Sequence, residues 1–87
     1  MNDVVIHPCV MERHPELSED DVREAQNGYV RMTRREGLDD CYVAIGFDSS
    51  GRAIEMVAVE TIEGAWYVYH AMTPPTSKLL RELGLMG

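Results

Sequence analysis

The sequence predicts a small α+β domain built on an antiparallel β-sheet. Three runs rich in Val, Ile and aromatic residues, at positions 41–47, 53–62 and 65–71, have the composition of packed strands. Short turns separate them, and such connections join antiparallel neighbours because a parallel return needs a much longer crossover. Segments with helical patterns flank these runs, which indicates a single α+β domain over residues 1–87.

The first part of the chain is predicted to contain a short strand and a short helix. Residues 4–6 are an apolar run that we expect to form an edge strand or an extended lead-in. Pro8 favours the first turn of a helix, which we predict over residues 8–14. Pro15 ends this helix, because proline cannot continue it.

The clearest local signal in the sequence is the start of a second helix at Ser18. Ser18 is a favoured N-cap, and Asp21, three residues later, completes a variant of the capping box. Three acidic residues in the first turn suit the positive end of the helix dipole. We predict that the helix runs to about Asn27, where Gly28 ends it.

Residues 29–34 alternate between apolar and polar side chains, which predicts a further strand. We expect it to pair with the strand at 41–47 through a loop at 36–40. A helical continuation is the alternative, and Gly28 argues against it. The sheet is therefore predicted to be a four-stranded antiparallel meander.

The last element is predicted to be a helix over residues 76–83, capped by Thr76 or, one turn earlier, by Thr73. Three leucines in this segment form an apolar stripe at helical spacing. The predicted order of elements is β-α-α-β-β-β-β-α, with helices before the meander and one helix after it.

Neither face of the predicted sheet is cleanly polar. Apolar side chains occupy both odd and even positions of the strands at 41–47 and 65–71. The chain's own helices can cover one face, and an uncovered apolar face usually marks an interaction site. We therefore expect a homodimer or a tight heterocomplex, because a chain this short buries little surface alone. The alternative is that small and amphipathic residues on the second face tolerate water.

Composition and charge disfavour several classes of protein. The formal net charge of -7 disfavours a general affinity for nucleic-acid backbones. Cys9 and Cys41 fit neither a disulfide framework nor a zinc-binding spacing, so we expect no metal and no cofactor. The sequence has no signal-peptide pattern and no run of membrane-spanning length, which predicts a reduced cytoplasmic protein without membrane contact.

Two blocks of the sequence together resemble a known group of proteins. Residues 7–22 read HPCVMERHPELSEDDV, and residues 42–54 read YVAIGFDSSGRAI, with YHAMT following at 69–73. These blocks resemble the BrnT-type toxins of bacterial type II toxin–antitoxin pairs, which are similar in fold to the RelE/ParE superfamily. The resemblance implies a ribonuclease that inhibits translation, with RNA as its substrate, and a small DNA-binding protein antitoxin that neutralises it.

The sequence also departs from this family's pattern. Residues 70–72 read His-Ala-Met where the toxins usually carry a basic residue soon after the last strand. The final helix keeps only Lys78 and Arg81 as basic residues, and the chain is acidic where the toxins tend to be basic. These departures favour a second interpretation, in which the protein is a non-catalytic interaction module or a degenerate toxin homologue that only oligomerises or binds a protein partner.

Cleavage of RNA by such a toxin needs side chains that activate the 2′-hydroxyl, stabilise the phosphate and protonate the leaving oxygen. We predict that His7 and His70 act as catalytic base and acid, where the last strand meets the final helix. The residues predicted to bind the substrate are Arg13, Arg52, Lys78 and Arg81. The alternative is that His70 is a half-buried strand residue bonded to a neighbour, and that His7 caps a helix.

A cluster of basic residues is formed by Arg31, Arg34 and Arg35. It could hold a phosphate, or pair with the acidic second helix or an acidic partner. We favour a third interpretation, a solvated charged edge that protects an exposed strand from aggregation.

Overall fold

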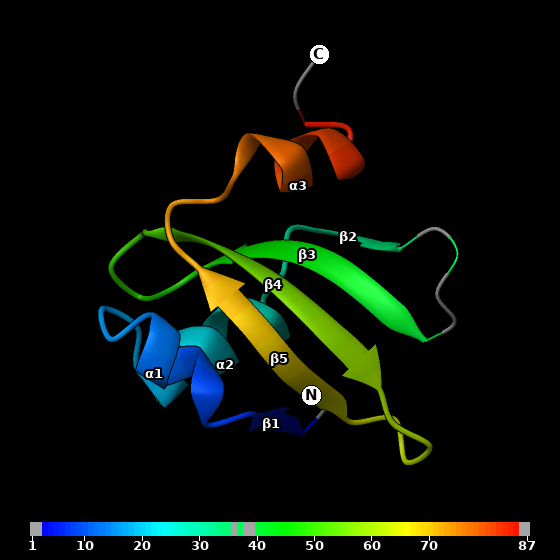
Figure 1. The fold of residues 1–87 in the computed structure, drawn as a ribbon, viewed down its shortest axis with the longest axis horizontal. Coiled ribbons are helices and arrows are strands. Elements are labelled where there is room, and N and C mark those ends of the chain that lie inside the picture. Colours follow the sequence, from blue (N-terminus) through cyan, green and yellow to red (C-terminus); the bar gives the residue numbers. More distant parts are fainter. Residues whose placement is uncertain (1–2, 36, 38–39, 86–87) are drawn as a thin grey trace.

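One β-sheet with helices on both of its faces organises the fold (Figure 1). The computed structural model describes residues 3–35, 37 and 40–85. Along the chain the elements are β1 (Val4–Ile6), α1 (Cys9–Arg13), α2 (Glu19–Asn27), β2 (Arg31–Arg34), β3 (Cys41–Phe47), β4 (Ala53–Glu60), β5 (Trp66–Met72) and α3 (Ser77–Glu82). The predicted α+β class is confirmed, and the ends of the elements lie within two residues of the predicted ends.

The strand order across the sheet is β1-β5-β4-β3-β2. Strands β2 to β5 form an antiparallel meander, whereas β1 pairs in parallel with β5 and places Val5 beside Tyr67. The sheet is therefore five-stranded and mixed, and the prediction of four antiparallel strands is wrong in this respect. The chain between β1 and β5 is long enough to serve as the crossover that a parallel pair needs. The loop predicted at 36–40 lies partly outside the described residues.

Helices α1 and α2 cover one face of the sheet. The core on this side combines Val10 of α1 and Val22 of α2 with apolar side chains from β1, β3, β4 and β5. Helix α2 approaches β3 closely at Gly46, where an added Cβ atom would lie 2.1 Å from the backbone oxygen of Ala25. Only glycine therefore permits this contact between the helix and the strand.

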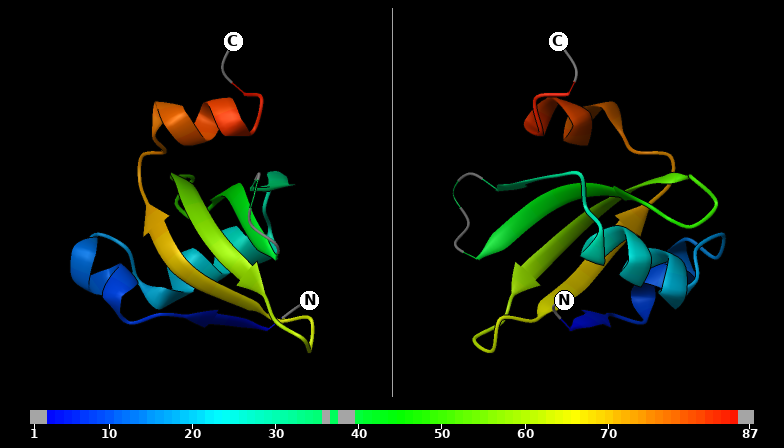
Figure 2. Two further views of the ribbon diagram at one scale, coloured as in Figure 1. Left: turned by 45° about the vertical axis from the view of Figure 1, so that its right-hand side comes forward. Right: turned by 180° about the vertical axis from the view of Figure 1, so that it is seen from behind.

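Helix α3 covers part of the opposite face (Figure 2). The buried residues of this second core are Cys41, Val43, Ile45, Val57, Leu79 and Leu83. On other strands Val5, Tyr67 and Tyr69 remain 56%, 36% and 37% exposed. On the second face, the side chains beneath α3 are thus buried, whereas those along β1 and β5 are exposed.

Side-chain caps fix the starts of two helices. The Oγ of Ser18 accepts a hydrogen bond of 3.1 Å from the backbone N–H of Asp21, and Oδ2 of Asp21 accepts one of 3.0 Å from the backbone N–H of Ser18. This reciprocal pair confirms the predicted capping box. At α3, Oγ1 of Thr76 accepts a hydrogen bond of 3.3 Å from the backbone N–H of Leu79, so Thr76 is the cap of the last helix.

Candidate functional site

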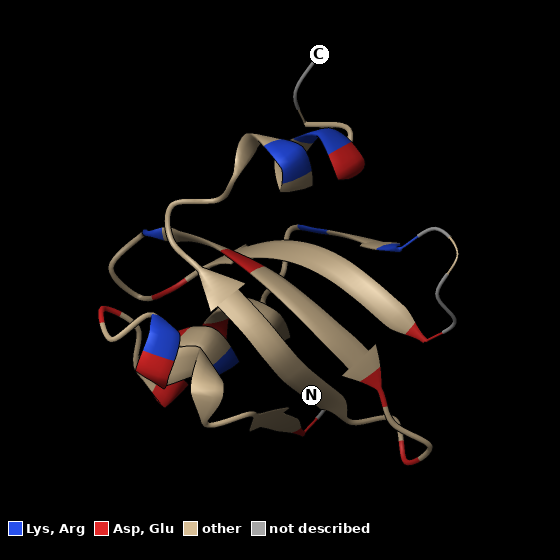
Figure 3. Ribbon diagram, in the orientation of Figure 1, with Lys and Arg blue, Asp and Glu red and all other residues tan. Residues whose placement is uncertain are grey.

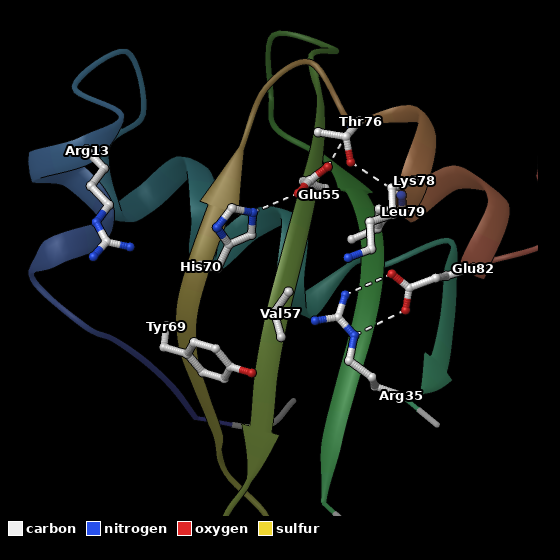
Figure 4. Close-up of a pocket in the computed structure, with 10 residues that line it drawn as sticks. All are labelled: Arg13, Arg35, Glu55, Val57, Tyr69, His70, Thr76, Lys78, Leu79 and Glu82. Carbon is white, nitrogen blue, oxygen red and sulfur yellow. Dashed lines mark hydrogen bonds and ion pairs between the residues drawn. The ribbon is translucent and has the colours of Figure 1, made fainter. Parts of the chain in front are cut away.

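A cavity of about 340 Å³ lies between the sheet and α3. Strands β4 and β5 form one wall, and α3 with the residue before it forms another. Arg13, at the end of α1, and Arg35, just after β2, complete the lining (Figure 4). The cavity is where the last strand meets the final helix, the region in which the sequence places a site.

An irregularity in the pairing of β4 with β5 shapes this cavity. Val57 pairs with His70, but the next residue of β4, Ala58, pairs with Val68, so Tyr69 is an extra residue in β5. Such a bulge interrupts the alternation of side chains along a strand. Tyr69 and His70 are neighbours in sequence, and because of the bulge both line the cavity.

A buried carboxylate holds His70 in place. Nε2 of His70 lies 2.7 Å from Oε2 of Glu55, and Oε1 of Glu55 accepts a hydrogen bond of 2.6 Å from the backbone N–H of Thr76. Glu55 is only 4% exposed. Burial disfavours its charged form, but the hydrogen bonds from His70 and Thr76 outweigh burial and hold the pKa of Glu55 below its ordinary value.

The ionised carboxylate decides which ring nitrogen of His70 carries a hydrogen. Because a carboxylate only accepts hydrogen bonds, Nε2 donates, and Nδ1 of the neutral ring keeps a free lone pair. Nδ1 points away from Glu55, toward the side on which Arg13 lies (Figure 4). Within the described part of the chain no hydrogen bond involves this nitrogen. Nδ1 is therefore available as a proton acceptor.

Two cations that line the cavity have no acidic partner among residues 3–35, 37 and 40–85. Glu82 neutralises Arg35 through hydrogen bonds of 2.9 and 3.1 Å, whereas Arg13 and Lys78 form no ion pair there. Figure 3 shows basic residues on α1 and α3, on the two sides of the end of β5. The charges of Arg13 and Lys78 are thus available to an anion, although the whole protein carries a net charge of -7.

Tyr69 contributes an aromatic ring to the cavity. Its hydroxyl lies 3.2 Å from Sγ of Cys41 on β3, so the ring is held across the sheet. Burial and the contact with Cys41 raise the pKa of Tyr69 to about 12. Tyr69 therefore stays protonated at neutral pH and does not serve as a base.

His7, predicted as the catalytic partner of His70, does not line this cavity. Its Nδ1 accepts a hydrogen bond of 3.0 Å from the backbone N–H of Cys9 at the start of α1. Its ring stacks with Tyr67, with the ring centroids 6.0 Å apart. The structure thus places His7 in the capping role given as the alternative, and the two histidines do not meet in the cavity.

Arg52 and Arg81 also lie outside the lining of the cavity. Arg52 donates hydrogen bonds to the carboxylates of Asp48 and Asp21, at 2.8 and 2.9 Å, and to the backbone oxygen of Glu16 at 3.0 Å. It therefore fastens the start of α2 to the turn between β3 and β4. The predicted site residues that do line the cavity are His70, Arg13 and Lys78.

Reasoning from the sequence missed Glu55, Tyr69 and the pair of Arg35 with Glu82. Glu55 lies inside the apolar strand β4, and a carboxylate is almost never buried there without a partner, which is the signal that could have identified it. Tyr69 depends on the bulge, which has no signal in the sequence that we can name.

Two arginines of the cluster after α2 tether the last helix. Nη1 of Arg31 donates to the backbone oxygen of Leu83 at 3.1 Å, and Arg35 binds Glu82. The favoured interpretation, a solvated charged edge, therefore misses this role. The tether positions the wall of the cavity that carries Lys78.

Comparison of the chain with protein-family models, with curated proteins and with solved structures gives no match. In the described residues no group of three or more His, Cys, Asp or Glu side chains is placed to hold a metal ion. None of the helices there combines the length and the apolar character needed to cross a membrane. A function therefore has to be inferred from the cavity and from the sequence pattern.

Proposed function

We propose that this protein is a toxin-like endoribonuclease of a type II toxin–antitoxin pair, with its active site in the cavity around His70. The observation that carries the proposal is the pair of His70 and buried Glu55 beside two unpaired cations, Arg13 and Lys78. An imidazole oriented by a carboxylate is suited to general base catalysis, and nearby cations stabilise phosphate charge. The resemblance to BrnT-type toxins supports the same function.

The proposed reaction is an internal transesterification of RNA. Nδ1 of His70 removes the proton of a 2′-hydroxyl, and the 2′-oxygen attacks the adjacent phosphorus. The bond from phosphorus to the 5′-oxygen of the next nucleotide breaks, and this oxygen takes a proton from the imidazolium. The products are a 2′,3′-cyclic phosphate and a free 5′-hydroxyl, so no further reactant is consumed.

The other residues of the cavity assist this reaction without forming bonds to the substrate carbon or phosphorus. Glu55 is a positioning residue, because its contact with Nε2 fixes the ring and stabilises the imidazolium that forms at His70. Arg13 and Lys78 stabilise the charge that develops on the phosphate.

A neutralising antitoxin is proposed to act on the same face of the sheet. Val5, Tyr67 and Tyr69 are exposed on this face, and contiguous exposed apolar side chains are typical of interaction sites. A protein that covers them would close the approach to His70. We therefore propose a heterocomplex, with a homodimer through the same residues as the competing arrangement.

A non-catalytic interaction module is the second candidate. The observation that favours it is the second bond of Glu55, which holds the start of α3 through the backbone of Thr76. The buried carboxylate thus has a structural role even without catalysis, and His70 would then serve only as its hydrogen-bonding partner.

Cleavage of a single-stranded oligoribonucleotide by the purified protein tests the first candidate. We expect His70→Ala to lower the cleavage rate by about 10²–10⁴-fold, the usual contribution of a general acid or base. A substrate with a 2′-deoxy sugar at the cleaved position should resist cleavage. Lys78→Ala should also slow the reaction, and Arg81→Ala is the matched control, since it removes a cation from the same helix outside the cavity.

Two results would count against the ribonuclease. Unchanged cleavage by His70→Ala would show that His70 is not the base. A wild-type protein that neither cuts RNA nor slows growth on induction, with or without the product of a neighbouring gene, would favour the interaction module.

A further inference from the structure

A strip of side chains extends from the cavity along β5 and β1. We call Val5, His7, Tyr67 and Tyr69 the tyrosine strip. Between these positions, every second side chain of β1 and of the first half of β5 is buried against α1 and α2, namely Val4, Ile6, Trp66 and Val68. Because successive side chains of a strand point to opposite faces, the strip lies on the face that α1 and α2 do not cover.

The tyrosine strip is suited to flat, apolar groups. A second cavity, of about 290 Å³, is lined by Val5, Ile6, His7, Pro8, Thr61 and Tyr67. No carboxylate is among them, in a chain with 15 acidic residues. The ring of Tyr67 is fixed by stacking with His7, and the ring of Tyr69 by Cys41. Both aromatic surfaces are therefore positioned before any ligand binds.

The tyrosine strip leads to the atoms of the proposed reaction. Tyr69 lines the first cavity together with His70, and Tyr67 precedes it by two residues, about 7 Å along the strand. This spacing leaves room for a separate base on each ring. Arg13 and Lys78 lie in the cavity with His70, where a phosphate would bind, whereas the cavity beside Tyr67 is lined by no Asp, Glu, Lys or Arg side chain and suits a base.

We propose that the tyrosine strip is a stacking platform for unpaired bases next to the scissile phosphate, so that the substrate of this site is single-stranded RNA. This inference rests on the proposed ribonuclease function. Aromatic side chains bind single strands of any sequence because every base has a π face. The bases of a duplex are already stacked on one another and are not free to lie on the rings.

The test is the binding of a short, labelled RNA without secondary structure, measured on His70→Ala protein so that the RNA stays intact. In this background Tyr67→Ala should weaken binding by about 5- to 100-fold, the loss of one stacked base. Tyr67→Phe should bind like its parent because it keeps the flat ring, whereas Tyr67→Leu should behave like Tyr67→Ala. Tyr29→Ala, which removes an exposed tyrosine just before β2, is the matched control and should leave the affinity unchanged.

Several outcomes would overturn the platform. The platform is wrong if Tyr67→Ala binds the RNA as tightly as its parent, or if the parent binds no RNA. It is also wrong if the parent binds a duplex of the same sequence as tightly as the single strand. Sedimentation adds a further check, because a dimer that Tyr67→Ala converts into monomers would show that a second copy of the chain occupies the tyrosine strip.

Cleavage distinguishes this inference from the function on which it rests. We expect Tyr67→Ala to lower kcat/KM for the longer RNA and to leave cleavage of a dinucleotide unchanged. If Tyr67→Ala cleaves both the longer RNA and the dinucleotide at the wild-type rate, the platform is wrong and the ribonuclease stands. If single strands bind through Tyr67 but the wild type never cuts them, the platform stands and the ribonuclease is wrong.

Discussion

Glu55 holds two groups at once, one with each carboxylate oxygen. Oε2 fixes the ring of His70, and Oε1 accepts the backbone N–H of Thr76 at the start of α3. Both bonds are stronger to the ionised carboxylate than to the protonated acid. This one side chain therefore links the candidate base to the position of the last helix.

Glu55→Gln should make the free energy of unfolding less sensitive to acid. The pKa of Glu55 in the folded protein lies below its ordinary value of 4.5, so the ionised group stabilises the fold above that pH. The stabilisation is lost as the pH falls through the folded-state pKa. The wild type should therefore lose stability as the pH falls below about 4.5, and Glu55→Gln should lose less. Urea unfolding at several pH values measures both.

The matched control is Glu60→Gln, which changes an exposed carboxylate at the end of the same strand. This variant should keep the pH dependence of the wild type. The same dependence in Glu55→Gln as in the wild type would contradict the lowered pKa.

At the scale of the elements, the contact of α2 with β3 depends on one missing side chain. At Gly46 the strand presents only backbone to the helix, and Ala25 is the helical residue that it meets. Because of this close approach, the buried face of α2 packs directly on the sheet that carries His70.

Gly46→Ala should lower the free energy of unfolding by about 1–3 kcal/mol or more, because the added methyl group overpacks the contact and displaces α2. The urea midpoint should fall while the slope of the transition stays unchanged. Gly28→Ala is the control, since its nearest new contact would be a more tolerable 3.3 Å. Wild-type stability in Gly46→Ala would mean that α2 does not approach the strand so closely.

Elements that depend on local signals could be predicted from the sequence. The capping box of Ser18, the helix start at Thr76 and the three strands after residue 40 all follow from patterns within a few residues. The partner of β1 could not be predicted, because three apolar residues contain no information on pairing and the parallel register depends on distant packing. The bulge at Tyr69 depends in the same way on the register between β4 and β5.

The same distinction applies to the candidate site. His70 and Lys78 could be expected near each other, because a helix that follows β5 directly begins close to the end of that strand. The expectation that the two ends of the chain meet on one face is wrong, since α1 and α3 cover opposite faces, and Arg13 reaches the cavity from the end of α1. The burial of Glu55 could be suspected from its place inside an apolar strand, but its partners could not, because His70 and Thr76 meet it only through the pairing of β4 with β5 and the position of α3. The sequence pattern places His7 in the cavity, whereas in the structure its ring accepts a hydrogen bond from the backbone N–H of Cys9, which the first turn of α1 leaves without a helical partner.

At the scale of the whole molecule, the charge of the protein opposes its proposed substrate. A net charge of -7 repels RNA at long range, whereas Arg13 and Lys78 attract phosphate at short range. Salt weakens the long-range repulsion of RNA more strongly than the short-range attraction of phosphate, because the Debye length is about 10 Å at 0.1 M.

Cleavage at low substrate concentration should therefore rise when salt is added, up to about 0.1 M, before it falls at higher salt. A basic RNA-binding protein shows the opposite trend at the low end, since its affinity decreases steadily with salt. Measurement of kcat/KM across a salt series tests this expectation.

Glu24→Lys is the informative variant for this prediction, because it reverses an exposed charge on α2, on the face opposite the cavity. It should raise kcat/KM at low salt and flatten the salt dependence without touching the site. A wild-type rate that falls from the lowest salt concentration onward would contradict the prediction.

The pairing of β1 with β5 also determines the order in which the molecule can be assembled. Val4 lies beside Trp66, so two helices and three strands separate the partners along the chain. During synthesis on a ribosome, β1 emerges early and stays unpaired until β5 has followed it. Contacts between such distant segments form slowly, because the intervening chain has to be ordered first. The sheet is therefore completed late, by the strand that was made before the other four.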